Sequence, residues 1–353
     1  MKKYWYKVAL MAVALGLFAA CSDDDDDEVI PPTPPVTTTG AYVINTGNWG
    51  ANNGSVQWYD VETKKISNDL FAAANGEGIG DVQDLCVYGS KVYIACSSSA
   101  KIEIVNRKTF KREKTLNLAN GAGEPIEPRY LTATGGNVYF TSYDGTVSKI
   151  DTVSLAVAAT VEVGDHPEAL TAADGKLYVN ISGYGSGDKI AVVNLASFAK
   201  TKDITVLLNP YNVCFTGEDG KVYFISCGDF GKTISSTLQC LDPATDKVES
   251  ICNASSAAIK DRKVYFIYAD YYSSVPGSIG VYDMDTKATT EFVAFSNFQN
   301  PAFIAVNPTS GDVYIGDQPH SALNDVYVYG SDGASKGQFE TGYYTTNMRF
   351  VTE

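Results

Sequence analysis

Short apolar segments with a tyrosine near their centre recur along this chain. Residues 221–225 read Lys-Val-Tyr-Phe-Ile, and such β-branched and aromatic residues favour strands. Both faces of these segments are apolar, which is typical of strands buried on both sides. The repeated tyrosines lie 39 to 51 residues apart, which is the spacing of four-stranded propeller blades. They are Tyr42, Tyr93, Tyr139, Tyr178, Tyr223, Tyr265 and Tyr314.

Each repeat predicts four strands, which we call A to D from the axis outward, with the tyrosine in strand B. Strand A precedes it, as in 169–172, and a glycine-containing turn such as 173–176 joins the two as a hairpin. Strand C ends in Asp or Asn, with Thr or Ser three residues later, which is typical of a capped turn and not of a metal ligand or catalytic acid. The pairs are Asp60/Thr63, Asn106/Thr109, Asp151/Ser154, Asn194/Ser197, Asp242/Thr245 and Asp283/Thr286.

The two ends of the repeat region complement each other. The strand around Tyr42 has no strand A before it, and 347–351 has the strand-A pattern with no strand B after it. Pairing these segments completes one blade from both ends of the chain and removes the exposed sheet edges of an open ring. The sequence therefore predicts an all-β fold, a seven-bladed β-propeller with N-/C-terminal strand closure, over residues 40–353.

The start of the chain predicts export and anchoring. Residues 1–20 contain three lysines followed by thirteen almost wholly apolar residues, too few to span a bilayer and typical of a signal peptide. Phe-Ala-Ala directly before Cys21 is similar to a bacterial lipobox, so we expect Cys21 to carry lipid. Residues 21–39 continue with an acidic run and a Pro- and Thr-rich tether. An ordinary cleaved signal and a solvated acidic spacer are the alternative interpretations.

Charge and histidine content narrow the function classes. The formal net charge is −14, and loss of the signal-peptide lysines makes the remaining chain more acidic. Nucleic acid is therefore an unsuitable partner. The two histidines, His166 and His320, fall three blades apart, which favours neither a compact metal site nor a Ser-His-Asp arrangement. We expect a binding protein and not an enzyme, with no catalytic residue, metal ligand or catalytic cofactor.

Six cysteines follow Cys21, and an oxidising compartment permits disulfides without requiring them. The sequence predicts either disulfides or buried free thiols, because a register slip of one residue places two partners on opposite faces. The candidate pairs are Cys86/Cys96, Cys214/Cys227 and Cys240/Cys252.

The tyrosine strands, the Asp-x-x-Thr turns and the segment His-Pro-Glu-Ala-Leu at 166–170 resemble the YncE-like bacterial propellers over residues 40–353. With the lipobox and acidic run, the chain is most similar to Bacteroidota surface lipoproteins that capture cobalamin (vitamin B12). The resemblance implies a lipid-anchored protein at the outer-membrane cell surface, which hands cobalamin to a TonB-dependent transporter and touches the membrane through its lipid only. A carbohydrate- or other nutrient-binding surface propeller is the alternative, since related propellers need not share a ligand.

The loops from strand B to C and from D to the next A open on one side of a propeller, which we call the BC/DA face. Aromatic side chains gather in these loops, where exposure costs free energy unless something covers them. A large amphipathic corrinoid suits such a face, and sugars also stack on Tyr and Trp. Packing onto its own loop is the alternative for any single ring, and a histidine ligating cobalt is a further possibility. The predicted ligand-binding residues are Trp49, Arg129, Tyr130, Tyr143, His166, Tyr184, Tyr211, Phe230, Tyr271, Tyr272, His320, Tyr343 and Tyr344.

Overall fold

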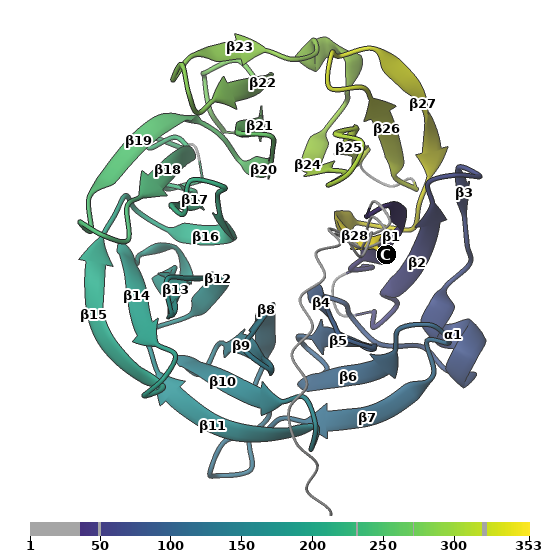
Figure 1. The fold of residues 1–353 in the computed structure, drawn as a ribbon, viewed down its shortest axis with the longest axis vertical. Helices are drawn as coiled ribbons and strands as arrows, with labels where there is room; N and C mark the ends of the chain where they lie inside the picture. Colours follow the sequence, from purple (N-terminus) through teal and green to yellow (C-terminus); the bar gives the residue numbers. More distant parts are fainter. Residues whose placement is uncertain (1–35, 49–50, 231, 271, 320–322) are drawn as a thin grey trace, which may run out of the picture. The chain divides into compact units, whose positions relative to one another are not determined.

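Seven four-stranded antiparallel sheets form a ring around a central axis in the computed structural model (Figure 1). This confirms the predicted seven-bladed β-propeller. The structure describes residues 36–48, 51–230, 232–270, 272–319 and 323–353. The predicted signal peptide and Cys21, together with Trp49, Tyr271 and His320, lie outside the described residues.

Each blade runs from strand A at the axis to strand D at the outer edge. Blade 1 contains β28 (Thr345–Thr352), β1 (Thr38–Asn45), β2 (Ser55–Asp60) and β3 (Lys65–Ile66), and blade 2 contains β4 (Asp84–Tyr88), β5 (Lys91–Cys96), β6 (Lys101–Asn106) and β7 (Arg112–Asn117). Blade 3 contains β8 (Pro128–Thr134), β9 (Asn137–Ser142), β10 (Thr146–Asp151) and β11 (Ala156–Glu162), and blade 4 contains β12 (Pro167–Ala173), β13 (Lys176–Ile181), β14 (Lys189–Asn194) and β15 (Ala199–Thr205). Blade 5 contains β16 (Pro210–Thr216), β17 (Val222–Ser226), β18 (Thr237–Leu241) and β19 (Val248–Asn253). Blade 6 contains β20 (Ser256–Lys260), β21 (Lys263–Tyr268), β22 (Ser278–Asp283) and β23 (Thr289–Glu291), and blade 7 contains β24 (Pro301–Val306), β25 (Val313–Asp317), β26 (Asp325–Tyr329) and β27 (Ser335–Glu340).

The repeated tyrosines of strand B form the core between blades, as predicted. All seven are at most 3% exposed, and they belong to apolar clusters that join neighbouring blades. Their hydroxyls differ in their partners, and within the described residues the buried hydroxyls of Tyr93 and Tyr178 have no hydrogen-bond partner. The hydroxyl of Tyr42 donates to the carbonyl of Arg107 at 2.9 Å, and burial raises the pKa of Tyr42 to about 12.

The ring is closed by pairing β1 with β28, in a register that places Tyr42 opposite Arg349. This confirms the predicted closure. The pairing extends outward, because the Thr37 amide donates to the Glu353 carbonyl at 2.9 Å. The Thr38 hydroxyl also donates to Asn307 of blade 7 at 2.7 Å. Thr38 and the residue after it, expected in the tether, therefore belong to the folded domain.

The Asp and Asn residues after strand C cap the C–D turns, as predicted. Asp151 Oδ1 accepts the amide of Ser154 at 2.7 Å and its hydroxyl at 2.8 Å, and these bonds lower the pKa of Asp151. The residue after the capped pair adopts positive φ, as at Leu155 (53°) and Phe198 (48°). This left-handed residue lets the chain reverse into strand D. The Asp-x-x-Thr spacing alone does not predict that the next residue has positive φ.

Blade 1 departs from the regular pattern at its outer edge. Strand β3 has two residues, and the helix α1 (Leu70–Asn75) follows it, capped by Asp69, whose side chain accepts the amide of Phe71. Phe71 is fully buried in the cluster between blades 1 and 2. Two single-turn 3-10 helices, η1 (Gly183–Gly185) and η2 (Phe295–Asn297), lie in other loops. Among the described residues, no helix is long and apolar enough to cross a membrane.

The six cysteines of the described chain are free thiols. In the register of blade 5, Cys240 lies opposite Glu249 and Cys252 lies opposite Leu238. Hairpin register in the same way places Cys86 opposite Tyr93. The strand register therefore places these cysteines opposite other residues, which leaves Cys240, Cys252 and Cys86 as free thiols. Burial raises the pKa of Cys240 to about 11, so this thiol stays protonated near neutral pH.

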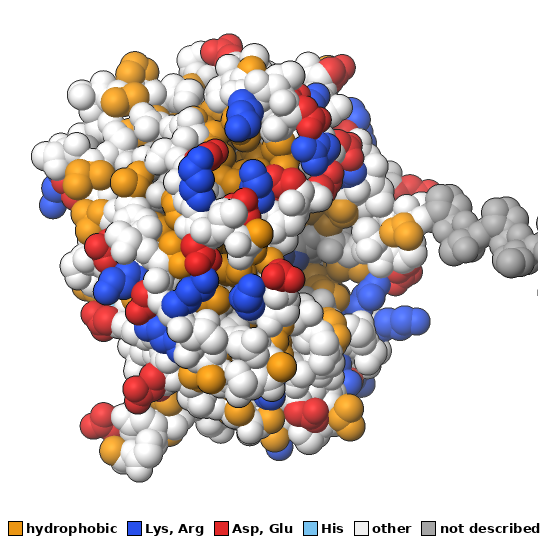
Figure 2. Space-filling view, turned by 60° about the vertical axis from the view of Figure 1, so that its left-hand side comes forward, with side chains coloured by type: hydrophobic (Ala, Val, Ile, Leu, Met, Phe, Trp, Pro, Cys, Tyr) orange, Lys and Arg blue, Asp and Glu red, His pale blue; other side chains and the backbone are white. Residues whose placement is uncertain are grey.

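Charges of both signs are interspersed on the outer surface of the blades (Figure 2). Lys200 pairs with Asp203 at 2.8 Å, and Lys247 pairs with Glu249 at 2.8 Å. Exposed pairs of this kind contribute little stability, typically below about 1 kcal/mol each. The outer strands therefore keep the propeller solvated, while its stability comes from the layers between blades.

Candidate ligand-binding site

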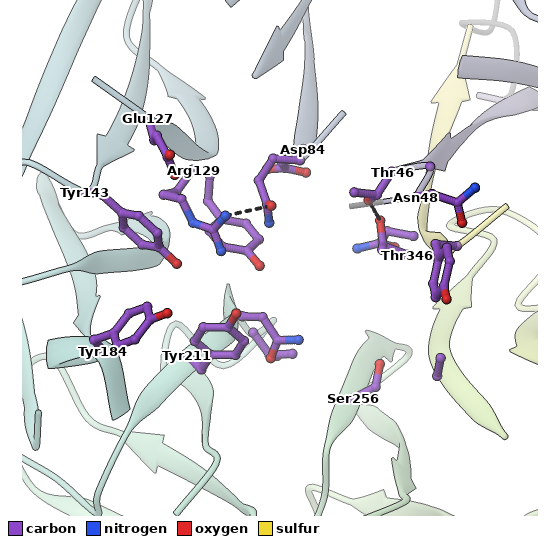
Figure 3. A pocket seen from close by; sticks show the side chains of 18 of the residues that line it. Thr46, Asn48, Asp84, Glu127, Arg129, Tyr143, Tyr184, Tyr211, Ser256 and Thr346 are labelled. Carbon is purple, nitrogen blue, oxygen red and sulfur yellow. Dashed lines mark hydrogen bonds between the residues drawn. The ribbon is translucent and has the colours of Figure 1, made fainter. Parts of the chain in front are cut away.

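A funnel of about 1100 Å³ opens around the axis on the BC/DA face. Residues from six of the A strands and from several B–C loops line it. Figure 3 shows these side chains pointing toward a common space from different blades. The lining residues include Thr46, Asn48, Gln83, Asp84, Glu127, Arg129, Tyr130, Tyr143, Asp144, Tyr184, Tyr211, Asn212, Ser256, Tyr344, Thr346 and Asn347.

The funnel has an aromatic wall and a polar wall. Tyr143, Tyr184 and Tyr211 come from blades 3, 4 and 5 and lie together on one side (Figure 3). Thr46 and Thr346 lie on the opposite side in the same view, with Asn48 beside them. A ligand in this space therefore meets three tyrosine rings on one side, and hydroxyl and amide groups with the single ring of Tyr344 on the other, where the Tyr344 carbonyl accepts the Thr46 amide at 3.0 Å.

A buried ion pair supports the aromatic wall. Arg129 Nε donates to Glu168 Oε2 at 2.9 Å, and the Tyr143 hydroxyl donates to Glu168 Oε1 at 2.7 Å. Arg129 and Glu168 are 6% and 1% exposed. The guanidinium also lies over the Tyr143 ring, 4.4 Å from its centroid, in cation–π geometry. Tyr143 is thus held at both its face and its hydroxyl.

Burial and charge act in opposite directions on this ion pair. Burial raises the pKa of Glu168, and the attraction of Arg129 with the hydrogen bond from Tyr143 opposes that rise. Burial alone would lower the pKa of Arg129, but Glu168 together with Tyr130, Tyr143 and Tyr211 outweighs it and raises the pKa above its ordinary value. Gln83 accepts a further hydrogen bond from Arg129 Nη1 at 2.8 Å. The cluster therefore fixes blades 2, 3 and 4 against one another at the funnel.

His166 packs behind the aromatic wall. Its ring centroid lies 4.8 Å from that of Tyr143 and 5.2 Å from that of Tyr184, and its Nδ1 is 2.7 Å from Asp165 Oδ1. His166 is not among the residues that line the funnel. Within the described chain, no group of three or more His, Cys, Asp or Glu side chains is arranged to hold a metal ion.

Exposed aromatic side chains surround the funnel. Those of the described chain all lie in loops of the BC/DA face, and Tyr184 is the most exposed at 79%. Tyr184, Phe230 and Tyr344 also have φ of 53°, 59° and 52°. Left-handed backbone is costly for bulky residues, and such strain is concentrated at functional sites. The exposed aromatics are Tyr184, Phe230, Tyr272, Tyr343 and Tyr344.

The loop that carries Phe230 is fixed by one carboxylate. Asp229 accepts hydrogen bonds from the Thr233 hydroxyl and amide and from the Ile234 amide. The Thr233 hydroxyl bond and then these amide bonds lower the pKa of Asp229 to about 2. The exposed Phe230 ring is therefore presented by a loop with internal hydrogen bonds.

Six of the predicted ligand-binding residues line one cavity, and the others take different places. His166 lies behind the funnel wall, Phe230, Tyr272 and Tyr343 lie outside the lining, and Trp49, Tyr271 and His320 fall outside the described residues. The residues in the lining are Arg129, Tyr130, Tyr143, Tyr184, Tyr211 and Tyr344.

Several lining residues were not predicted, although they share one position in the fold. Asp84, Asn212, Ser256 and Thr346 lie at or near the start of their A strands. The A strands begin where the BC/DA face meets the axis, and the first residues of six of them, all except β12, line the funnel. Aligning the A strands on their hairpins and reading these first positions was the signal that would have found them.

The fold and funnel define this protein as a seven-bladed β-propeller with an open axial cavity. Residues 39–350 match the family described as "Domain of unknown function (DUF5074)", and the chain belongs to this family. No curated protein matches the chain.

The solved structures with a similar fold belong to proteins whose names describe different functions. The chain is similar to Kuenenia stuttgartiensis hydrazine synthase at 14% identity and a TM-score of 0.59, over 77% of this chain and 95% of that one. The Neurospora crassa Pan2 WD40 domain is similar at 10% identity and 0.53, over 75% and 79%. A chain of the Mitotic Checkpoint Complex is similar at 11% and 0.55, over 97% and 91%. Such identities show the propeller fold alone.

Proposed function

We propose that this protein is a non-enzymatic, cell-surface binding protein that captures cobalamin in the axial funnel. The observation that carries the proposal is the open cavity of about 1100 Å³ with an aromatic wall facing a polar wall. A corrinoid is a large, rigid ring system that needs apolar contact over its faces and hydrogen bonds for the amides along its edge. The resemblance of the strands, turns and N-terminal segment to cobalamin-capturing surface propellers supports the same ligand.

The tyrosines of the funnel can supply the free energy for tight binding. An aromatic side chain buries roughly 150–250 Å², which at about 25 cal/mol/Å² corresponds to about 4–6 kcal/mol for a fully exposed ring. Tyr184 approaches that limit because it is 79% exposed, whereas Tyr143 and Tyr211 are already half-buried and contribute less. The hydrogen bond from Tyr143 to Glu168 orders its ring before the ligand arrives, which lowers the entropic cost of association.

The chain from residue 21 onward, with Cys21→Ser, is expected to bind cyanocobalamin with about one ligand per chain. Mixing followed by desalting should leave red colour with the protein, and calorimetry should give the stoichiometry of a single funnel. Colourless protein would contradict the proposal. A glycan array would then test the carbohydrate alternative, which the exposed rings of Tyr184 and Tyr272 favour as stacking surfaces.

Replacing Tyr184 and Tyr344 together with alanine is expected to weaken cobalamin binding by a few kcal/mol, on the scale of interface hot spots. Both rings line the funnel, and both are exposed enough that their removal leaves the core intact. Calorimetry measures the loss. Val153→Ala is the matched control, because Val153 is 90% exposed in a C–D turn on the opposite face. Equal affinity of the double variant and the control would place the ligand elsewhere.

We propose further that Cys21 carries lipid at the cell surface and that a TonB-dependent transporter receives the ligand. Cys21→Ser is expected to move the protein from the membrane fraction to the soluble fraction, because the lipid is the anchor. Fractionation of cells after a salt wash measures this. Cys252→Ser, in the folded domain, is the control and should stay with the membrane. A Cys21→Ser protein that resists the salt wash would reject the anchor.

A further inference from the structure

The funnel continues along the axis into a second cavity of about 420 Å³, which we call the axial channel. Its walls are the inner strands of blades 1 to 6, and it reaches residues such as Val87 and Phe350 deep along those strands. The two cavities are continuous because they share lining residues at one level of the axis. The shared residues are Asp84, Tyr130, Asn212, Val213, Ala257 and Asn347.

Arg349 on β28 presents its guanidinium to this channel. Its Nη2 donates to Asp84 Oδ1 at 2.8 Å, and its Nε lies 3.4 Å from the Leu85 carbonyl. Its side chain is 39% exposed, whereas that of Asp84 is 4% exposed. Within the described chain, Nη1 of Arg349 has no hydrogen-bond partner. The guanidinium is therefore oriented by Asp84, which lines the same channel, and within the described residues its Nη1 donors stay free.

Arg349 differs in this respect from the other arginine of the cavities. Arg129 is buried, with its Nε donating to Glu168 and its Nη1 donating to Gln83 and Ser97. Among the described residues that line the funnel and channel, the cations are Arg129 and Arg349, and Arg349 is the more accessible one, with 39% of its side chain exposed against 7% for Arg129. The side-chain amide of Asn212 is exposed at the level where the two cavities meet, which adds a neutral donor there.

We propose that Arg349 is the subsite for the phosphodiester group of the ligand held in the funnel. The planar guanidinium offers paired N–H donors that match two phosphate oxygens. Asp84 offsets part of its charge, which suits a group with one negative charge better than doubly charged free phosphate. This inference rests on the proposed function, because cobalamin carries a single anionic group, the phosphodiester of its nucleotide loop. The corrin ring then occupies the funnel, and the nucleotide loop faces the channel.

Two corrinoids that differ in this group test the subsite. Cyanocobalamin contains the phosphodiester, and dicyanocobinamide lacks the whole nucleotide loop. Arg349→Gln is expected to weaken cyanocobalamin binding about 10- to 100-fold, the scale of a hydrogen bond to a charged group. Binding of dicyanocobinamide should be unchanged. Arg349→Lys should fall between the two, because a lysine supplies charge without the paired donors.

Thermal melting of each variant checks that the fold survives, since Arg349→Gln leaves the Asp84 carboxylate without its cation. The double variant Asp84→Asn/Arg349→Gln removes both charges and should show the same selective loss of cyanocobalamin. Unchanged cyanocobalamin affinity in a folded variant, or an equal loss for both corrinoids, would overturn the subsite. Binding of inorganic phosphate alone, at affinity comparable to cyanocobalamin, would assign Arg349 to free phosphate and also overturn it. If the unaltered protein binds neither corrinoid, the proposed function itself fails.

Discussion

A chain that ends at Thr346 is expected to lose its cooperative fold, because it lacks most of β28 and with it strand A of blade 1. Met348 and Val351 are 2% and 5% exposed and belong to two different clusters, on either side of the blade. Burial of two such side chains is worth about 3–6 kcal/mol, and the lost pairing with β1 adds to this. The sum is comparable to the whole stability of a typical domain, about 5–15 kcal/mol.

Circular dichroism and thermal melting of the truncated protein measure this effect. The shortened chain also exposes β1 as an edge strand, which favours aggregation. Removing Glu353 alone is the control, since it deletes an exposed ion pair with Arg107 and the terminal backbone bonds to Thr37 but leaves β28 in place. Equal melting temperatures for the two truncations would show that the ring does not depend on its closing strand.

Replacing Arg129 with methionine is expected to lower the free energy of unfolding by about 3–5 kcal/mol, the usual cost of removing one partner of a buried ion pair. Glu168, which is 1% exposed, would be left buried without its counter-charge. Tyr143 would also lose the guanidinium that lies over its ring. Urea unfolding followed by fluorescence measures the change, and calorimetry with cyanocobalamin reports whether the aromatic wall is still ordered.

The double variant Arg129→Met/Glu168→Leu separates charge from packing. Replacing both partners of a buried ion pair with apolar residues is often neutral or stabilising, so most of the lost stability should return. If the double variant is as unstable as Arg129→Met, the unpaired charge of Glu168 is not the cause. Tyr143→Phe removes the remaining hydrogen bond to Glu168 and should cost about 1–3 kcal/mol in the otherwise unaltered protein.

The features that were predicted from the sequence are local or repeated. The burial of a tyrosine strand such as 221–225 can be predicted from the segment itself, because its apolar residues occupy both faces. The cap of the turn at Asp151 can also be predicted locally, because the Asp151 carboxylate and the Ser154 groups that donate to it lie three residues apart. Closure of the ring was predictable for a different reason, since the unmatched segments at Tyr42 and 347–351 each lack the partner that the other supplies.

The features that were not predicted depend on register and on contacts between blades. The cysteines are free because the hairpin registers place Cys240 opposite Glu249 and Cys86 opposite Tyr93. Spacing along the chain does not distinguish this register from its neighbours. The helix α1 likewise has only a short apolar pattern in the sequence. Its position is fixed by the burial of Phe71 between two blades.

The candidate site shows the same division most clearly. Aromatic and polar loop residues predicted the face on which the funnel opens, because exposed rings are unusual wherever they occur. The ion pairs that organise the site join residues far apart, with Arg129 and Glu168 separated by 39 positions and Arg349 and Asp84 by 265. The curvature of the ring determines which of these charged residues meet, because it brings the starts of different A strands to one axis. A linear pattern carries composition and period, whereas pairing around a closed ring exists only once the blades have packed.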